Sequence, residues 1–329
     1  MKKKTDKTKS VNGLLVIGDP HIEGRKPNFR CDDYPRVILD KIRWCLNYSA
    51  KHKLLPVFLG DMFEKPRDNP TWMLGELIEM MINSNSIGIY GNHDCAEPQL
   101  TENDSLMILI KAGCLQLVSK TEPWIGEVNG RRTVIGGSSY REDVPERFDL
   151  KLLPQSGLFD ETPLVIWLTH HDVEVGTYEG GRFKPSSIEN VQLLINGHIH
   201  RRMDPVQAGE TLWMTPGNIS RRSRHDAVRR HAPAVLLVRA CTESDHVPKF
   251  ETEFVEIPHQ PSEKIFHVAG SETEEDLGPS AFIAGLKELQ QTKTESGAGL
   301  HEFLEKNVDQ FPEPVASEIM ALATEVTSE

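Results

Sequence analysis

Five short blocks rich in His, Asp and Asn dominate this sequence, and each follows directly on a short apolar run. The blocks are Gly18-Asp19-Pro20-His21, Gly60-Asp61, Gly91-Asn92-His93-Asp94, Thr169-His170-His171-Asp172 and Gly197-His198-Ile199-His200. Most of the preceding runs are rich in Val, Ile and Leu, which is typical of strands buried on both faces of a sheet. Because α/β proteins place ligand sites at the loop ends of their strands, the pattern predicts one site built from all five blocks.

The remaining periodicity indicates the fold class. Apolar residues recur at helical spacing across residues 38–49, which predicts a helix there, and a second helix is expected across 70–83. In the second half, consecutive strands are expected at Thr211–Met214, Ala234–Arg239 and Phe250–Ile257. We therefore expect an α/β fold, a layered sandwich whose second half is largely antiparallel.

Composition divides the chain into four parts. The basic, polar residues 1–11 are expected to be a flexible lead-in, and residues 12–257 form the predicted catalytic domain. Proline, glycine and an acidic run mark residues 258–280 as a linker. Beyond it, residues 281–329 show short apolar repeats at helical spacing, which predicts an acidic helical tail. The tail could pack back on the body or present a docking surface for a partner.

The net charge of −12 lies almost entirely at the C-terminal end. Residues 258–329 carry 14 Asp/Glu and 4 Lys/Arg, whereas residues 1–257 carry 35 and 33. The body is therefore nearly neutral, and the acidic pI does not exclude a nucleic-acid substrate. The five cysteines are spread out without a Cys-x-x-Cys pair, which favours a reducing, cytoplasmic location. No apolar run approaches the roughly 18–20 residues of a membrane span, so no membrane association is expected.

The residue types of the blocks suit divalent transition metals. Imidazole and carboxylate groups together bind Mn, Fe or Zn better than Mg or Ca. The pairs Asp19/His21 and His198/His200 are each separated by one residue, so their members are expected to face the same way on extended backbone or to fan around a turn. Asp61 stands alone in its block and is the natural bridge between two ions. Two ions about 3.5–4 Å apart activate water and hold phosphate oxygens, whereas an acid or base alone contributes only about 10²–10⁴-fold.

The ordered series Asp-x-His, Gly-Asp, Gly-Asn-His-Asp, His and Gly-His-x-His resembles that of the calcineurin-like metallophosphoesterases over about residues 12–240. This resemblance implies two mixed sheets flanked by helices, with a small helical C-terminal tail, and two divalent transition-metal ions, Mn²⁺ first with Fe or Zn as alternatives. The implied ligands of the first ion are Asp19, His21, Asp61 and His200. Those of the second are Asp61, Asn92, His170 and His198.

The same resemblance implies two catalytic residues. His93 would be the acid that meets the leaving group or the phosphate, and Asp94 would orient its imidazole. In the fourth block the family's ligand is the first histidine after the strand, which favours His170 over His171.

Three further stretches resemble the SbcD-type DNA repair exonucleases: Gly60-Asp61-Met62-Phe63 with Pro66, Gly136 to Arg141, and Thr215 to Ser220. By this resemblance an SbcC-like ATPase is expected as a partner through the tail. The sequence departs from the pattern in two respects. Asn218 stands where the family has Ser, and the tail is smaller than the family's C-terminal DNA-recognition region.

Arginines near the last motif bear on the substrate. Arg221, Arg222 and Arg224 follow the last motif and suit backbone phosphates, although a solvated edge is the alternative. Tyr140 is a further candidate for substrate binding. The leading hypothesis is a DNA nuclease, and the second is a phosphoesterase for small molecules such as cyclic nucleotides, or for phosphoproteins. The third hypothesis is a non-catalytic scaffold, which would lack metal ligands, and none of the expected ligands is missing here. The sequence leaves open whether the protein forms a homodimer.

Overall fold

The computed structural model describes residues 9–27, 30–153, 162–176, 178, 181–222, 231–242 and 249–266. Contacts divide the chain into two units, Met1–Phe266 and His267–Glu329. The predicted acidic tail and most of the predicted linker belong to the second unit, which lies outside the described residues. The fold that follows is therefore that of the first unit.

One sheet has six strands in the order β13-β12-β2-β3-β4-β5. Its parallel part consists of β2 (Gly13–Ile17), β3 (Leu54–Phe58), β4 (Ser86–Gly88) and β5 (Leu115–Leu117). An antiparallel edge is added by β12 (Ala234–Ala240) and β13 (Phe250–Glu256). The sheet is therefore mixed, with the parallel strands carrying the first three blocks.

The other sheet has seven strands in the order β1-β6-β7-β8-β9-β11-β10. They are β1 (Ser10–Val11), β6 (Trp124–Val128), β7 (Arg131–Ser138), β8 (Leu164–Thr169), β9 (Leu193–Asn196), β10 (Val206–Ala208) and β11 (Thr211–Met214). Strands β7, β8, β9 and β11 are parallel.

The expectation of a largely antiparallel second half is wrong for β11. The β10–β11 hairpin turns at Gly209, so β11 returns alongside β9 in the parallel direction. Strands β12 and β13 do pair antiparallel, but they join the other sheet through β2.

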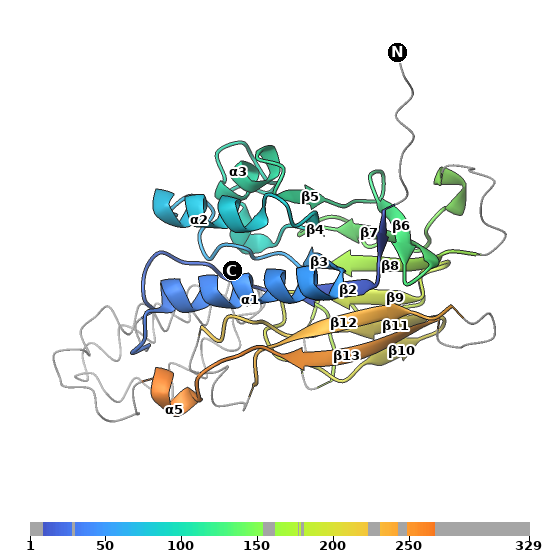
Figure 1. The fold of residues 1–329 in the computed structure, drawn as a ribbon. Coiled ribbons are helices and arrows are strands. Elements are labelled where there is room, and N and C mark those ends of the chain that lie inside the picture. Colours follow the sequence, from blue (N-terminus) through green and yellow to red (C-terminus); the bar gives the residue numbers. More distant parts are fainter. Residues whose placement is uncertain are drawn as a thin grey trace, which may run out of the picture. The chain divides into compact units, whose positions relative to one another are not determined.

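The helices cover the outer face of the six-stranded sheet. They are α1 (Tyr34–His52), α2 (Thr71–Met81) and α3 (Ser105–Lys111), and Figure 1 shows α1 lying along β2 and β3. The Asp33 side chain caps the first turn of α1, and Lys53 ends the helix with a left-handed φ of 57°. In the described part of the chain, no helix is both long and apolar enough to cross a bilayer.

The apolar strands are buried on both faces, as their sequence predicts. In β2, Leu14 and Val16 face the core between the two sheets, whereas Leu15 and Ile17 pack against the helices. In β8, Ile166 faces the inter-sheet core, and its neighbour Trp167 belongs to a third cluster on the far side. The expected layered sandwich of two mixed sheets with helices is confirmed.

Two boundaries differ from the expected ones. Ser10 and Val11 pair with β6, so the seven-stranded sheet begins inside the expected lead-in of residues 1–11. Residues 258–266 include α5 (Ser262–Ile265) and pack on the body, where Cys31 N–H donates to Ile265 O at 2.9 Å. The first part of the predicted linker thus belongs to the folded unit.

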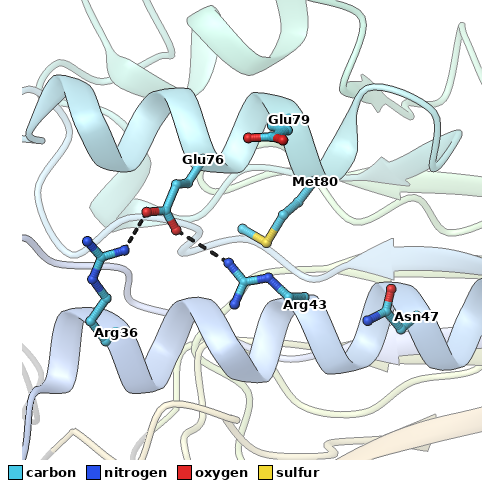
Figure 2. Close-up of a pocket in the computed structure, with 6 residues that line it drawn as sticks. All are labelled: Arg36, Arg43, Asn47, Glu76, Glu79 and Met80. Atoms are coloured by element: carbon cyan, nitrogen blue, oxygen red, sulfur yellow. Dashed lines mark hydrogen bonds and ion pairs between the residues drawn. The ribbon is translucent and has the colours of Figure 1, made fainter.

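A polar groove lies between α1 and α2 (Figure 2). Glu76 reaches Arg36 and Arg43 across it, the latter at 3.4 Å. Its lining residues are Arg36, Arg43, Asn47, Glu76, Glu79 and Met80. None of the predicted metal-binding residues is among them, so the groove is separate from the predicted site.

Candidate metal centre

All five blocks lie at the carboxyl ends of parallel strands. The first three follow β2, β3 and β4 of one sheet, and the last two follow β8 and β9 of the other. The carboxyl edges of the two sheets lie next to each other. His198 follows β9, and its backbone N–H donates at 3.0 Å to the carboxylate of Asp19, which follows β2. The sandwich therefore brings together segments 179 residues apart in the sequence, at the edge where α/β proteins bind ligands.

Four of the predicted ligands have a left-handed backbone conformation. The φ angles are 37° for Asp19, 46° for His21, 47° for Asp61 and 67° for His198. Each such conformation costs an L residue about 1–3 kcal/mol and persists where the surrounding structure enforces it, most often at functional sites. The fold therefore carries a conformational free-energy cost at these four residues, and this backbone conformation directs their side chains.

Two glycines let the ends of β3 and β4 approach each other. Gly60 has a φ of 95°, and a Cβ there would lie 2.7 Å from the backbone nitrogen of Gly91. A Cβ on Gly91 would collide with the carboxylate of Asp61. A larger residue at Gly60 would displace Gly91 and the ring of His170, and one at Gly91 would displace Asp61, so both glycines are needed for packing at the site.

The donor atoms form two groups that share Asp61. One contains His21, Asp61 and His93, and the other contains Asp61, His170 and His198. Within each group, the donor atoms lie within 4.8 Å of one another. A carboxylate common to both groups is what a bridge between two ions requires.

The contacts of His200 and Asn92 agree with this division, whereas Asp19 Oδ1 lies 3.5 Å from His170 Nδ1 of the second group. His200 Nε2 lies 2.8 Å from His21 Nε2, beside the first group. Asn92 Oδ1 lies 3.1 Å from His170 Nε2 and 3.0 Å from His198 Nδ1, inside the second.

The donor set fits metal ions. Ions about 2.0–2.2 Å from each ligand atom place neighbouring donors roughly 2.8–3.6 Å apart, from octahedral to tetrahedral geometry. The contacts from 2.8 Å (His21–His200) to 3.6 Å (His21 Nε2–Asp61 Oδ2) span the same range. In addition, Asp19 Oδ2 is buried without a hydrogen-bond partner, an arrangement that is costly unless a cation satisfies the oxygen.

Polar contacts from outside the centre favour one tautomer in each of two imidazoles. His170 Nδ1 donates to Leu59 O at 2.7 Å, which leaves the lone pair of Nε2 for a metal. His21 Nδ1 lies 2.9 Å from Glu64 Oε2, with the same consequence for its Nε2. His171 instead donates through Nε2 to Glu142 O at 2.7 Å, and burial lowers its pKa. The structure therefore places His170, and not His171, among the donors.

His93 and Asp94 have different environments from those predicted. His93 Nδ1 donates to Glu64 O at 2.9 Å, so its Nε2 is left for a ligand or substrate. The Asp94 carboxylate accepts from the backbone of Phe63 at 3.1 Å and of Gly91 at 2.9 Å. Burial raises the pKa of Asp94 to about 7. The bonds of Asp94 thus hold the loop backbone, and the contact that orients His93 comes from Glu64.

Glu64 is a residue that the sequence analysis missed. Its side chain contacts His21, its backbone carbonyl holds His93, and its second carboxylate oxygen lies 3.2 Å from Arg222. Burial alone would raise the pKa of Glu64, but the hydrogen bond and charge of His21, with His93 and Arg222, lower it to about 2. The only sequence signal is its place three residues after Asp61.

The predicted substrate-binding residues are dispersed. Arg221 is 5% exposed and donates to Gln260 O at 3.0 Å, so it is not part of an exposed phosphate-binding surface. Arg222 is held by Glu23 and Glu64. Arg224 lies outside the described residues. Tyr140 is half-buried, and its backbone N–H donates to Tyr90 O at 3.1 Å, just before the third block.

The family model of the calcineurin-like phosphoesterases matches residues 14–202, more than half of the chain. The chain belongs to the calcineurin-like phosphoesterase family. All five blocks fall inside the match, so this family member is a metal-dependent phosphoester hydrolase that uses divalent ions. No curated protein matches the sequence.

Several solved structures show a weak likeness, each at 14% identity. A hypothetical protein from Thermus thermophilus aligns with a TM-score of 0.42 over 75% of this chain and 100% of its own. The 5'-nucleotidase from Candida albicans aligns with a TM-score of 0.41 over 76% of this chain and 52% of its own. The 5'-nucleotidase precursor from Thermus thermophilus aligns with a TM-score of 0.45 over 85% of this chain and 60% of its own. This chain thus spans about half to three fifths of the two nucleotidases, and such weak likenesses do not bear on its substrate.

Proposed function

We propose that this protein hydrolyses phosphodiesters at a two-metal centre bridged by Asp61. The observation that carries the proposal is the presence of Asp61 in both donor groups. When bound, the two ions supply Lewis-acid activation of the attacking water and neutralise charge on the phosphate. We propose Mn²⁺ as the metal, because four imidazoles in the predicted ligand set favour transition ions over Mg²⁺ or Ca²⁺.

The protein's own residues divide the remaining work. Asp19, His21 and His200 would hold one ion and Asn92, His170 and His198 the other, with Asp61 common to both. In its imidazolium form His93 would deliver the Nε2 proton to the leaving oxygen and become neutral, while its Nδ1–H stays bonded to Glu64 O. A positioned acid of this kind contributes about 10²–10⁴-fold.

For the substrate we propose DNA, as in the SbcD-type exonucleases. The support is the position of two stretches that resemble those enzymes. In the stretch Thr215–Ser220, Asn218 N–H donates to His200 O and Ile219 N–H donates to Gly18 O, both at 3.0 Å. The stretch Gly136–Arg141 contacts Tyr90, directly before the third block, through the backbone N–H of Tyr140. Both therefore border the metal centre, where they could shape a substrate path.

A small-molecule phosphoesterase is the second candidate, and the arginines favour it. Arg221 is buried and Arg222 is engaged by two carboxylates, so neither is available as a simple phosphate-binding charge. Duplex recognition would then need other residues.

One comparison of substrates separates the candidates. The Mn²⁺-loaded protein is given labelled single- and double-stranded DNA, a cyclic nucleotide, a nitrophenyl diester and a nitrophenyl monoester, with His198→Ala as the inactive control. Cleavage of DNA at a kcat/KM well above that of the cyclic nucleotide supports the nuclease proposal. The reverse order supports the second candidate, and hydrolysis of the monoester alone overturns the diesterase proposal.

A further inference from the structure

Arg222 lies between two buried carboxylates at the edge of the metal centre. Its Nε and one terminal nitrogen both lie 3.1 Å from Glu23 Oε2. The same terminal nitrogen lies 3.2 Å from Glu64 Oε1. Glu23 and Glu64 are 8% and 9% exposed, so neither has much water to replace this partner. The guanidinium therefore fixes the position of both carboxylates.

Glu64 transmits this position to two histidines. Its other carboxylate oxygen, Oε2, lies 2.9 Å from His21 Nδ1. Its backbone carbonyl accepts the hydrogen bond of His93 Nδ1. Glu64 thus orients both His21, a predicted ligand, and His93, the predicted acid. A rotation of the Glu64 side chain would remove its contact with His21.

The backbone that carries Arg222 is itself held from several sides. Arg30 donates to the carbonyl of Arg221 at 2.6 Å, and Lys41 donates to the carbonyl of Ile219 at 2.6 Å. Arg221 has a left-handed φ of 53° and is anchored to Gln260 O. These contacts fix the backbone that carries Arg222.

We propose that Arg222 is a positioning residue. Together with Glu23 it locks the Glu64 side chain, and through Glu64 it holds His21 for metal binding and His93 for proton delivery. The inference rests on the proposed two-metal function. It differs from a direct substrate contact, because the guanidinium is already engaged by the carboxylates of Glu23 and Glu64.

The test uses Arg222→Gln and Glu23→Gln in the full chain, with Arg239→Gln as the matched control. The control breaks an exposed Arg–Glu pair outside the predicted site, Arg239 with Glu253 at 3.4 Å, between β12 and β13. Mn²⁺ binding to the metal-stripped protein is measured by calorimetry, and kcat and KM with a nitrophenyl diester. Partners outside the ligand shell usually contribute about 10–100-fold to metal affinity or activity, so we expect a loss of that size in the affinity of one metal site and in kcat. We expect KM to stay within about twofold, and Arg239→Gln to match the parent.

A double-mutant cycle decides between positioning and substrate binding. If Arg222 acts through Glu64, Arg222→Gln should add less than about twofold to the metal-binding defect of Glu64→Gln. Independent, multiplying defects overturn the proposal, as does a raised KM with unchanged kcat and metal affinity. Glu23→Gln preserves side-chain volume, so the test stands even if Arg222→Gln unfolds. Should the parent protein hydrolyse no ester, the proposed function fails, while the metal titration still tests the positioning of Glu64.

Discussion

The buried Lys41 gives a stability prediction whose size follows from the structure. Its Nζ is buried on α1 and donates to the carbonyls of Ile219 at 2.6 Å and Ser220 at 3.3 Å. Burial, together with the positive charges of Arg30 and Arg221, lowers the pKa of Lys41 from 10.5 to about 7. The ammonium is therefore destabilising in the folded state at neutral pH. We predict that Lys41→Met changes the pH dependence of stability.

The direction of this pH dependence follows from the number of protons that Lys41 binds in the folded and unfolded states. Between pH 7 and 10.5 the unfolded chain keeps the Lys41 proton while the folded chain loses it, so the free energy of unfolding rises with pH. The slope is at most about 1.4 kcal/mol for each pH unit, and the whole interval amounts to about 5 kcal/mol. Below pH 7 both states are protonated, and the contribution is constant.

The assay is urea unfolding of the metal-stripped parent and Lys41→Met proteins from pH 6 to 10. The hydrogen bonds lost in the variant shift the difference equally at every pH, so the slope alone carries the test. We expect the parent to gain stability relative to the variant across this interval. A flat difference, or one that falls with pH, refutes the argument that Lys41 is buried with excess positive charge around it.

The metal centre and the tail give four further predictions. Chelation should abolish hydrolysis and lower the Tm, since ions bound to the native state stabilise it; full activity in chelator would contradict a metal mechanism. Asp61→Asn removes the only carboxylate shared by the two donor groups and should empty at least one site, which metal analysis would show. His93→Ala should retain both ions while turnover falls about 10²–10⁴-fold, with a smaller defect on nitrophenyl esters; loss of metal would instead make His93 a ligand. Removing residues 271–329 should leave metal binding intact, because the described unit ends at Phe266, and should abolish co-purification with an SbcC-like ATPase if the tail docks it.

The strand framework could be read from the sequence because burial on both faces leaves a clear chemical pattern. Runs such as that of β8 are continuously apolar, and each ends where a polar block begins. The pairing of β11 could not be read in this way, since its direction depends on the β10–β11 hairpin and not on its own residues. Local composition predicts a strand, whereas sheet order depends on the path of the chain between strands.

The contacts around the centre were harder to predict than its donors. Glu64 and Arg222 are ordinary charged residues in the sequence, and only the folded loops bring them within 3.2 Å of each other. Asp94 is adjacent to His93, but its carboxylate turns to the amides of Phe63 and Gly91. Arg221 was predicted to bind substrate phosphates, with a solvated edge as the alternative, but it is buried and bonded to the segment after β13. Sequence shows which charges are present and not which of them are buried.

The meeting of the first and fifth blocks has a consequence for biosynthesis. Asp19 and His198 are 179 residues apart, and at about 5–20 residues per second the ribosome needs roughly 10–40 s to make the chain between them. Closing a loop of that length costs about 5 kcal/mol of chain entropy. During this interval the nascent chain displays Asp19, His21 and Asp61 without the histidines of β8 and β9. High-affinity capture of both ions would therefore wait until β8 and β9 have been made and have docked, which would make metal loading a late step of maturation.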